Sequence, residues 1–243
     1  MRKEIQHHSI VGTFIGLREP RVATIAATAG FDTVVIDMEH GSFNIETVEN
    51  IINAAHASDI FAIVRLSGVF GRGIQSVLEA GADGIIVPMI ENKEQLQYLI
   101  KQAKYPPLGK RGFHPFTPAT EFGKIPPSDV IYHANDKILI AAQIETKKGL
   151  DNVEEIASVE GLDMLFFGPG DFSVSTGVAM DDASVFNASK QVSEVAFKSQ
   201  RLFGTFVMTK DGIAPAKKAG AKLVVCASDT LFLSNSMKIN DGD

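Results

Sequence analysis

Residues 29–41 read AGFDTVVIDMEHG, and residues 80–89 repeat the beginning of that pattern as AGADGIIVPM. In each stretch a glycine is placed to end a helix, and an aspartate two residues later opens a turn into an apolar run. The run is nearly continuous, which is typical of a parallel strand buried on both faces. The pattern therefore predicts units in which a helix, a short turn and a buried strand follow one another.

Apolar runs rich in Val, Ile and Phe occur eight times, and each precedes a segment able to form a helix. The runs are SIVGTFIG (9–16), TVVIDME (33–39), FAIVRL (61–66), GIIVPM (84–89), ILIAAQIE (138–145), MLFFGP (164–169), LFGTFV (202–207) and KLVVCA (222–227). Residues 45–57 and 92–103 are expected to be helices that cover the strands. Because 243 residues suit one α/β barrel, we predict a single (β/α)8 barrel domain over residues 1–243, with a last helix at about 229–239.

A doubly wound open sheet is the alternative architecture. No GxGxxG turn follows residues 9–16, and charged residues follow several predicted strands, which suits a closed ring better than a single crevice. Residues 105–127 have no clear periodicity, and their prolines argue against a continuous helix. Whether the FHPFTPATEFG stretch (113–123) reaches the site of its own chain or of another subunit is left open.

The composition narrows the choice of partners. The chain has 23 Lys and Arg against 29 Asp and Glu, and its net charge of −6 offers no general attraction to nucleic acid or to anionic membranes. It contains no run of about twenty apolar residues and no leader pattern, so we expect a cytoplasmic protein. The single cysteine, Cys226, is expected to be a buried strand thiol rather than a nucleophile.

Ionisable side chains lie at the ends of four of the predicted strands or just after them: Glu39 and His40, Arg65, Glu145, and Asp171. In a barrel of alternating strands and helices, the carboxyl ends of all strands face one mouth. Residues that are far apart in the sequence therefore converge there. The sequence predicts a functional site as well as a fold.

Glu145 and Asp171 would follow neighbouring strands, which lie about 4.8 Å apart in such a barrel. Two carboxylates at that spacing are able to share a hard divalent cation such as Mg²⁺ or Mn²⁺, with positions left for water or a chelating substrate. A zinc site would more often include His or Cys. The alternative is that Glu145 caps a helix that starts near Thr146 and that Asp171 caps a turn after GPG. The residue pattern alone leaves both interpretations open.

Arg65 ends an apolar strand, so its cation should either pair with a carboxylate or bind an anionic ligand. A pair with Asp37 or Glu39 is the structural alternative, whereas the fork of the guanidinium suits a substrate carboxylate or a developing enolate oxygen. His40 follows Glu39 at the end of the second strand, and histidine as a residue type suits the role of a general base. Asp83, in GADGIIVP, either orients that imidazole or is a turn aspartate.

Other candidates are weaker. His114 is the one further histidine considered for the site. A Schiff-base enzyme needs a lysine amine in the mouth, yet no predicted strand ends in lysine, and Lys147 is the nearest candidate. The seventh and eighth strands are followed by VMTKDG and CASDT without a glycine-rich cradle, so a phosphorylated substrate is not indicated.

The segments IDMEHG, VRL, GADGIIVPM, YPPLGKRG, QIET and FFGPGDFS occur in the order seen in the HpcH/HpaI aldolase/citrate lyase family. The chain resembles this family from about Gly12 to Asp229. The resemblance implies a (β/α)8 barrel of the phosphoenolpyruvate/pyruvate-binding superfamily. It also implies metal-dependent, reversible aldol cleavage of a 4-hydroxy-2-oxo acid to pyruvate and an aldehyde. The metal would be Mg²⁺ or Mn²⁺, with Co²⁺ as a further candidate.

The resemblance also assigns roles to residues. It makes His40 the base, Arg65 the substrate-binding arginine and Asp83 the partner of the histidine, while Glu145 and Asp171 become the metal ligands. The residues that it places around pyruvate are Gln143, Gly168, Pro169, Gly170 and Asp171 in addition to Arg65.

The chain departs from the family pattern in two places. Gly170 and Phe172 stand where the family often has GPADLS, and residues 113–123 lack the arginine-containing run of many members, which leaves the aldehyde open. The family commonly forms trimers or hexamers with an exchanged last helix, and the apolar residues 231–233 would suit that packing or packing within their own chain. The alternatives to an aldolase are another carbon–carbon lyase or decarboxylase, including an acyl-CoA lyase, and a non-catalytic barrel that binds a 2-oxo acid.

Overall fold

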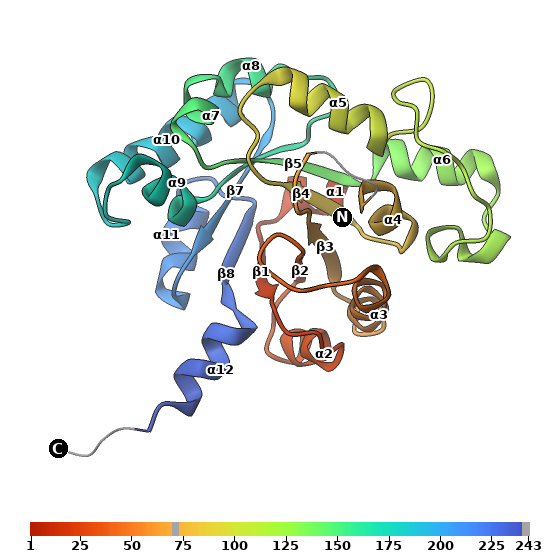
Figure 1. Ribbon diagram of the computed structural model, residues 1–243, viewed down its shortest axis with the longest axis horizontal. Helices are drawn as coiled ribbons and strands as arrows, with labels where there is room; N and C mark the ends of the chain where they lie inside the picture. Colours follow the sequence, from red (N-terminus) through yellow and green to blue (C-terminus); the bar gives the residue numbers. More distant parts are fainter. Residues whose placement is uncertain (70–72, 240–243) are drawn as a thin grey trace.

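Eight parallel strands close into a barrel in the computed structural model, which describes residues 1–69 and 73–239 (Figure 1). Each strand pairs with the next along the chain, and β8 pairs with β1. The strands are β1 (Ile10–Ile15), β2 (Thr33–Asp37), β3 (Phe61–Arg65), β4 (Gly84–Val87), β5 (Leu139–Ile144), β6 (Met164–Phe167), β7 (Leu202–Val207) and β8 (Leu223–Ser228). The predicted (β/α)8 barrel is confirmed, and the open sheet is excluded.

Helices alternate with the strands and cover the outside of the barrel (Figure 1). They are α1 (Arg2–His7), α2 (Arg21–Thr28), α3 (Ile45–His56), α4 (Gly73–Glu79), α5 (Lys93–Ala103), η1 (Pro118–Gly123), α6 (Pro127–Asp136), α7 (Lys147–Asp151), α8 (Val153–Ala157), α9 (Pro169–Thr176), α10 (Ala183–Lys198), η2 (Lys210–Gly212), α11 (Ile213–Lys218) and α12 (Asp229–Met237). The helices predicted at residues 45–57 and 92–103 are α3 and α5. Asn44 and Asn92 cap them by accepting hydrogen bonds from backbone N–H groups.

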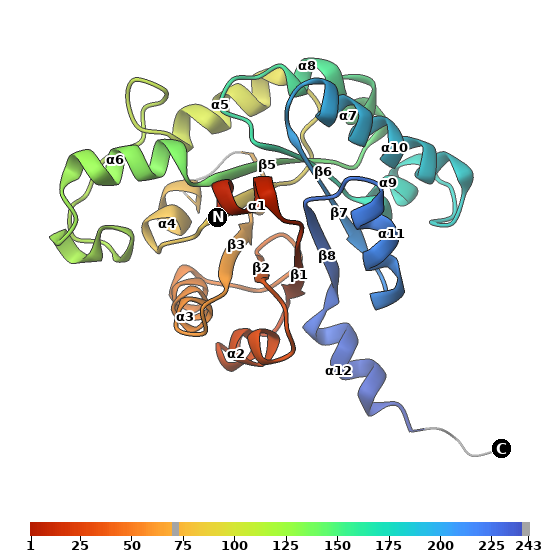
Figure 2. The ribbon, with the colours of Figure 1, turned by 180° about the vertical axis from the view of Figure 1, so that it is seen from behind.

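Successive side chains of each strand enter two different cores. Val34 and Ile36 of β2 pack in the outer core between the strands and the helices, while Val35 packs in the core inside the barrel. Helix α1 contributes Ile5, which is fully buried in this inner core among the first residues of several strands. This helix, seen in front in Figure 2, therefore closes the amino-terminal end of the barrel.

A turn of the form Gly-x-Asp occurs before three of the strands, at residues 30–32, 81–83 and 161–163. Each glycine has a positive φ, between 88° and 100°, which suits a residue without a Cβ. Each aspartate accepts a hydrogen bond through Oδ2 from a backbone N–H near the start of the preceding strand. The pairs are Asp32 with Val11 (2.8 Å), Asp83 with Ala62 (2.9 Å) and Asp163 with Ile140 (2.9 Å). These turns join neighbouring strands at the amino-terminal end of the barrel.

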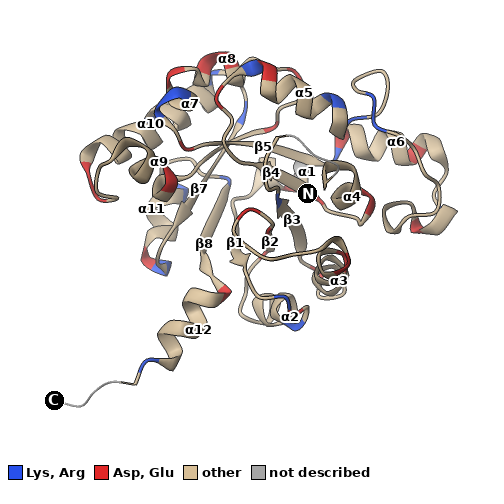
Figure 3. Ribbon diagram, viewed as in Figure 1, with Lys and Arg blue, Asp and Glu red and all other residues tan. Residues whose placement is uncertain are grey.

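The segment between α5 and α6 lies on the flank of the barrel. Its 3₁₀ helix η1 contacts α4. Lys and Arg are interspersed with Asp and Glu over the outer helices (Figure 3). Within the described ranges, no helix has the length and apolar character needed to cross a membrane.

Candidate active site

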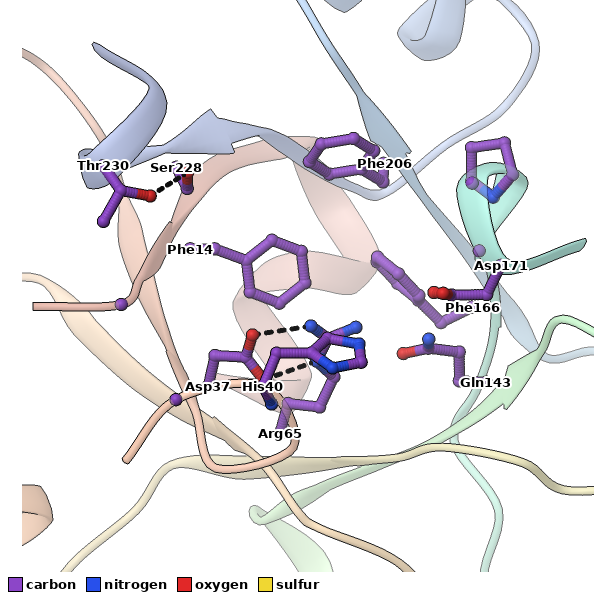
Figure 4. Close-up of a pocket in the computed structure, with 15 residues that line it drawn as sticks. Phe14, Asp37, His40, Arg65, Gln143, Phe166, Asp171, Phe206, Ser228 and Thr230 are labelled. Carbon is purple, nitrogen blue, oxygen red and sulfur yellow. Dashed lines mark hydrogen bonds and ion pairs between the residues drawn. The ribbon is translucent and has the colours of Figure 1, made fainter. Parts of the chain in front are cut away.

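The carboxyl ends of the strands enclose a cavity of about 410 Å³ at the mouth of the barrel (Figure 4). This volume falls in the lower part of the range found for small-molecule sites. The lining residues are Phe14, Gly16, Asp37, His40, Gly41, Arg65, Gln143, Phe166, Gly168, Pro169, Gly170, Asp171, Phe206, Ser228 and Thr230. All of the predicted site residues except Glu145 and Asp83 line this cavity.

Arg65 lies beside Asp37 because β2 and β3 pair in the register that places their last residues opposite each other. The guanidinium donates from Nε to Asp37 Oδ1 (2.9 Å) and from Nη2 to Asp37 Oδ2 (2.7 Å). Its Nη1 lies 3.3 Å from Glu39 Oε2, and its Cζ lies 4.4 Å from the centre of the Phe14 ring. The ion pairs considered as the structural alternative are therefore present. They hold the guanidinium at the wall of the cavity, where an anionic ligand would meet it.

Glu145 lies next to the cavity behind Gln143, and it is only 2% exposed. Its Oε1 accepts a hydrogen bond from the Met89 backbone N–H at 2.6 Å, and its Oε2 accepts one from Gln143 Nε2. The helix that follows, α7, is capped by Thr146, whose Oγ1 accepts from the Gly149 N–H at 3.0 Å. The interpretation of Glu145 as the helix cap is therefore wrong.

Asp171 reaches the cavity from the first turn of α9 (Figure 4). Its side chain makes no capping hydrogen bond at the start of this helix, where Gly168 is the N-cap residue. A Cβ at Gly168 would lie 3.1 Å from Gln143 Nε2 and 3.2 Å from Glu145 Oε2, whereas a Cβ at Gly170 would meet nothing within 4 Å. Only the first of these two glycines therefore permits the close packing of α9 against the end of β5.

Carboxylates outnumber cations around the mouth. Burial, together with the negative charges of Glu39 and Asp171, raises the pKa of Glu145 to about 7. Burial likewise raises the pKa of Glu39 to about 6, even though the Arg65 guanidinium is nearby. Since a neighbouring positive charge favours the ionised form of a carboxyl group, these shifts indicate a place where a further cation would be stabilised.

The donor set at this place suits a hard divalent cation. Glu39 Oε2 and Gln143 Oε1 are buried and have no hydrogen-bond partner among the described residues. Carboxylate and amide oxygens are ligands of Mg²⁺ and Mn²⁺. No three His, Cys, Asp or Glu residues in the described part of the chain are grouped so that they could hold a metal ion. A cation here would therefore bind at most two such side chains and would leave its other coordination positions to water or substrate.

His40 follows β2 in a tight turn that faces the cavity. The backbone N–H groups of Glu39 and His40 donate to Asp37 Oδ1 at 3.1 and 3.3 Å. A Cβ at Gly41 would lie 2.3 Å from the Asp37 carbonyl oxygen, so the turn requires glycine. The imidazole lies at the cavity (Figure 4), with Nε2 3.7 Å from Glu39 Oε2, beyond hydrogen-bond distance.

The predicted pairing of Asp83 with His40 is wrong. Asp83 precedes β4 and lies at the amino-terminal end of the barrel, opposite the mouth. There its Oδ2 lies 2.9 Å from Nε2 of His56, and this hydrogen bond raises the pKa of His56. Asp83 is therefore the turn aspartate of the alternative interpretation.

The remaining sequence candidates lie away from the cavity. Lys147 pairs with Asp151 on the surface of α7, and no lysine is among the described residues that line the mouth. His114 accepts a hydrogen bond from the Phe116 N–H outside the cavity. Cys226 is a buried residue of β8, as predicted, and burial raises the pKa of its thiol.

Sequence reasoning missed the aromatic and hydroxyl wall of the cavity, formed by Phe14, Phe206, Ser228 and Thr230. Ser228 ends β8 and Thr230 follows it, and this position at a strand end was the available signal. Phe14 and Phe206 lie inside apolar runs, where nothing in the sequence distinguishes a ring at the mouth from a ring in the core.

Comparison with known proteins agrees with this geometry. Residues 11–236 match the family model described as HpcH/HpaI aldolase/citrate lyase. The chain is 32% identical to a hydroxypyruvate/pyruvate aldolase of Roseobacter denitrificans, over 95% of this chain and 90% of the relative. It is 30% identical to a 4-hydroxy-2-oxo-heptane-1,7-dioate aldolase of Escherichia coli, over 93% of this chain and 87% of the relative.

Solved structures show the same likeness. The crystal structure of the citrate synthase SbnG superposes with a TM-score of 0.89 at 30% identity, and the match covers 98% of this chain and 94% of SbnG. The family model spans almost the whole chain. The chain therefore belongs to the HpcH/HpaI aldolase/citrate lyase family.

Proposed function

We propose that the protein catalyses the metal-dependent, reversible aldol cleavage of a 4-hydroxy-2-oxo acid to pyruvate and an aldehyde. The observation that carries the proposal is the meeting of Arg65, Gln143 and Asp171 in one cavity, with the buried Glu145 bonded to Gln143. The names of the two aldolase relatives support the same reaction class.

Glu145 and Asp171 would hold the divalent cation, with Mg²⁺ or Mn²⁺ as first candidates and Co²⁺ as a further one. When bound, the cation supplies positive charge that offsets the negative charge growing on the substrate oxygens. The raised pKa values of Glu39 and Glu145 support a cation at this place.

Arg65 would stabilise the enolate that is left when the bond between C3 and C4 of the substrate breaks. Because Asp37 fixes the guanidinium through two hydrogen bonds, Arg65 needs little reorganisation as charge develops. The backbone from Gly168 to Asp171 and the Gln143 amide would orient the pyruvate part of the substrate beside it.

His40 would act as the base. Its imidazole would take the proton of the 4-hydroxyl group as C3 and C4 separate, and the aldehyde would then leave. Protonation of the enolate at C3 completes pyruvate. Glu39, whose Oε2 lies 3.7 Å from His40 Nε2, is the carboxylate beside the imidazole, in the place that was expected for Asp83.

Metal removal is the direct test. We expect the purified protein to release pyruvate from at least one compound in a panel of 4-hydroxy-2-oxo acids. The panel includes compounds whose aldehyde part is uncharged and compounds whose aldehyde part carries a second carboxylate. EDTA should abolish this release, and Mg²⁺, Mn²⁺ or Co²⁺ should restore it, as followed with a coupled lactate dehydrogenase assay. Activity that survives EDTA, together with a borohydride-trapped adduct on a lysine, would contradict the proposal.

A second candidate is a different carbon–carbon bond reaction at the same site, which the 30% identity to the citrate synthase SbnG favours. Direct measurement of oxaloacetate consumption and of CoA release from acyl-CoA thioesters, on the same metal-loaded protein, separates the two. Turnover of these compounds with no release of pyruvate from any 4-hydroxy-2-oxo acid would favour the second candidate. Metal binding without any turnover would instead favour a non-catalytic 2-oxo-acid-binding barrel.

We also propose a homo-oligomer, a trimer or a hexamer, in which α12 packs on a neighbouring subunit. Figure 1 shows α12 leaving the barrel, and Leu233 and Met237 on it are 44% and 68% exposed. A groove of about 450 Å³ between α2 and α12 is lined mainly by apolar residues, including Ile25, Phe232 and Leu233. Burial of these side chains against another chain would stabilise the assembly.

Asp83→Ala should lower stability and leave catalysis intact. The loss of the hydrogen bonds to Ala62 and His56 should cost about 1–3 kcal/mol of unfolding free energy. Because Asp83 raises the pKa of His56, their interaction stabilises the fold fully below the unfolded-state pKa of about 6.5 and fades as pH rises through the folded-state pKa. The destabilisation measured by urea should therefore be larger near pH 5.5 than near pH 8.5.

Asp32→Ala is the matched control for this test. Asp32 makes the same turn contact with Val11, and no described histidine bonds to it, so its effect should not share this pH dependence. A shifted pH profile of kcat in Asp83→Ala would instead show that Asp83 takes part in catalysis.

A further inference from the structure

Arg111 is a buried cation that is fixed in position on the flank of the barrel. It belongs to the segment between α5 and α6, and its backbone N–H donates to the Lys104 carbonyl at 2.9 Å. A Cβ at Gly109 would lie 2.2 Å from the same oxygen, so the segment packs tightly against the end of α5. The position of Arg111 is therefore set by the fold.

Among the residues that the structure describes, none forms an ion pair with the Arg111 guanidinium. The residue is 6% exposed, and its Cζ lies 4.7 Å from the centre of the Tyr105 ring. Nε and Nη1 are buried and donate to no group in the part of the chain that the structure describes. Glu79 acts on Arg111 only through its field, since its carboxylate accepts from Gln75 Nε2 at 2.8 Å. A buried cation without an anionic partner lowers the stability of the fold unless a ligand supplies the negative charge.

Arg111 lines a cavity of about 300 Å³ between α4 and α6, two helices that lie side by side in Figures 1 and 2. The apolar wall of the cavity includes Leu78, Val130 and Ile138, and its polar rim includes Asp129, His133 and Lys137. None of the residues that line it lines the mouth cavity. It is therefore a separate site.

We propose that this cavity binds a small organic monocarboxylate, with the carboxylate on Arg111 and the apolar body against Leu78, Val130 and Ile138. A guanidinium fork matches the two oxygens of a carboxylate. Lys137 at the rim adds attraction for an anion, while Asp129 opposes a second negative charge on the ligand. Because part of the wall is aliphatic, the cavity favours a ligand with an apolar organic body over an inorganic ion.

Benzoate titrated into the full-length protein is the probe. With Ile, Leu and Val methyl groups labelled for NMR, we expect saturable shifts of the methyl signals of Leu78, Val130 and Ile138 at millimolar benzoate. Arg111→Met should weaken this binding by at least about tenfold. Benzamide, which has the same ring without the charge, should not produce the shifts. Equal shifts with benzamide, or unchanged affinity in Arg111→Met, would overturn the proposal, as would the absence of shifts at any of the three residues.

Two further measurements keep the test decisive if Arg111→Met is poorly folded. Ala119 also lines the cavity, so Ala119→Phe should fill it and block benzoate binding while Arg111 remains. Sedimentation of Arg111→Met then separates a ligand site from a subunit contact. If that variant loses the assembly of the parent protein, the partner of Arg111 is a carboxylate of another chain, and the monocarboxylate site is wrong.

Discussion

Glu145→Gln should lower kcat/KM for pyruvate release by about 10²–10³ at saturating metal, because it removes the buried charge that would hold the cation at the mouth. The substitution keeps the size of the side chain, and its amide oxygen still accepts the Met89 N–H that Glu145 binds at 2.6 Å. The fold should therefore persist. Metal affinity, measured by calorimetry on the EDTA-treated protein, should fall together with activity.

Glu155→Gln is the control for this substitution. Glu155 lies on α8 with its side chain 64% exposed, and its Oε2 lies 3.8 Å from Lys93 Nζ. The same change of charge at that position should leave both kcat/KM and metal affinity unaltered. Normal metal affinity and normal turnover in Glu145→Gln would remove Glu145 from the proposed mechanism.

Gly168→Ala should reduce kcat by about tenfold or more, since small displacements of positioning groups have large effects on rate. The added methyl would lie 3.1 Å from Gln143 Nε2 and 3.3 Å from Glu145 Cβ, so the end of β5 or the start of α9 must move. Either movement displaces Asp171 relative to Glu145. Single-turnover measurement of pyruvate release would separate this effect from product dissociation.

Gly170→Ala provides the matched comparison two residues away. A Cβ there has nothing within 4 Å, so this variant should keep nearly full activity and stability. It also restores the alanine that the family often has at this position. Equal losses in Gly168→Ala and Gly170→Ala would show that the activity responds to stiffness of the turn instead of contact with Gln143 and Glu145.

The sequence predicted the barrel and its mouth well because both depend on local patterns. Eight buried runs became eight strands, and the residues just after them, such as His40, Arg65 and Asp171, line the mouth. A polar residue at the end of an apolar run can be recognised within a single segment of the sequence. Closure of the parallel barrel then brings the carboxyl ends of all strands together, so the meeting of these residues follows from the fold alone.

Asp83 shows where this reasoning failed. It comes before its strand, whereas the mouth is built from residues at or just after the carboxyl ends of strands. The same turn occurs at residues 30–32 and 161–163, and the aspartate has the same hydrogen-bonding role each time. Comparison among the repeated units of this chain would have identified Asp83 as a structural residue.

Other features depended on contacts that no local pattern contains. Helix α1 has only six residues, too few for a stable isolated helix, and it is buried through Ile5 against residues from distant strands. The link between Asp37 and Arg65 requires the register of β2 and β3. Tertiary packing therefore determines both the position of α1 and the pairing of Asp37 with Arg65.

The three Gly-x-Asp turns also bear on how this barrel could change its substrate. They join strands at one end of the molecule, while Phe14, Phe206, Ser228 and Thr230 line the cavity at the other end. Substitutions at these four positions touch none of the three turns. Ser228 also caps α12, and Phe14 is buried in the inner core under Arg65. A library that varies Phe206 and Thr230 alone should thus yield many folded proteins with altered aldehyde preference.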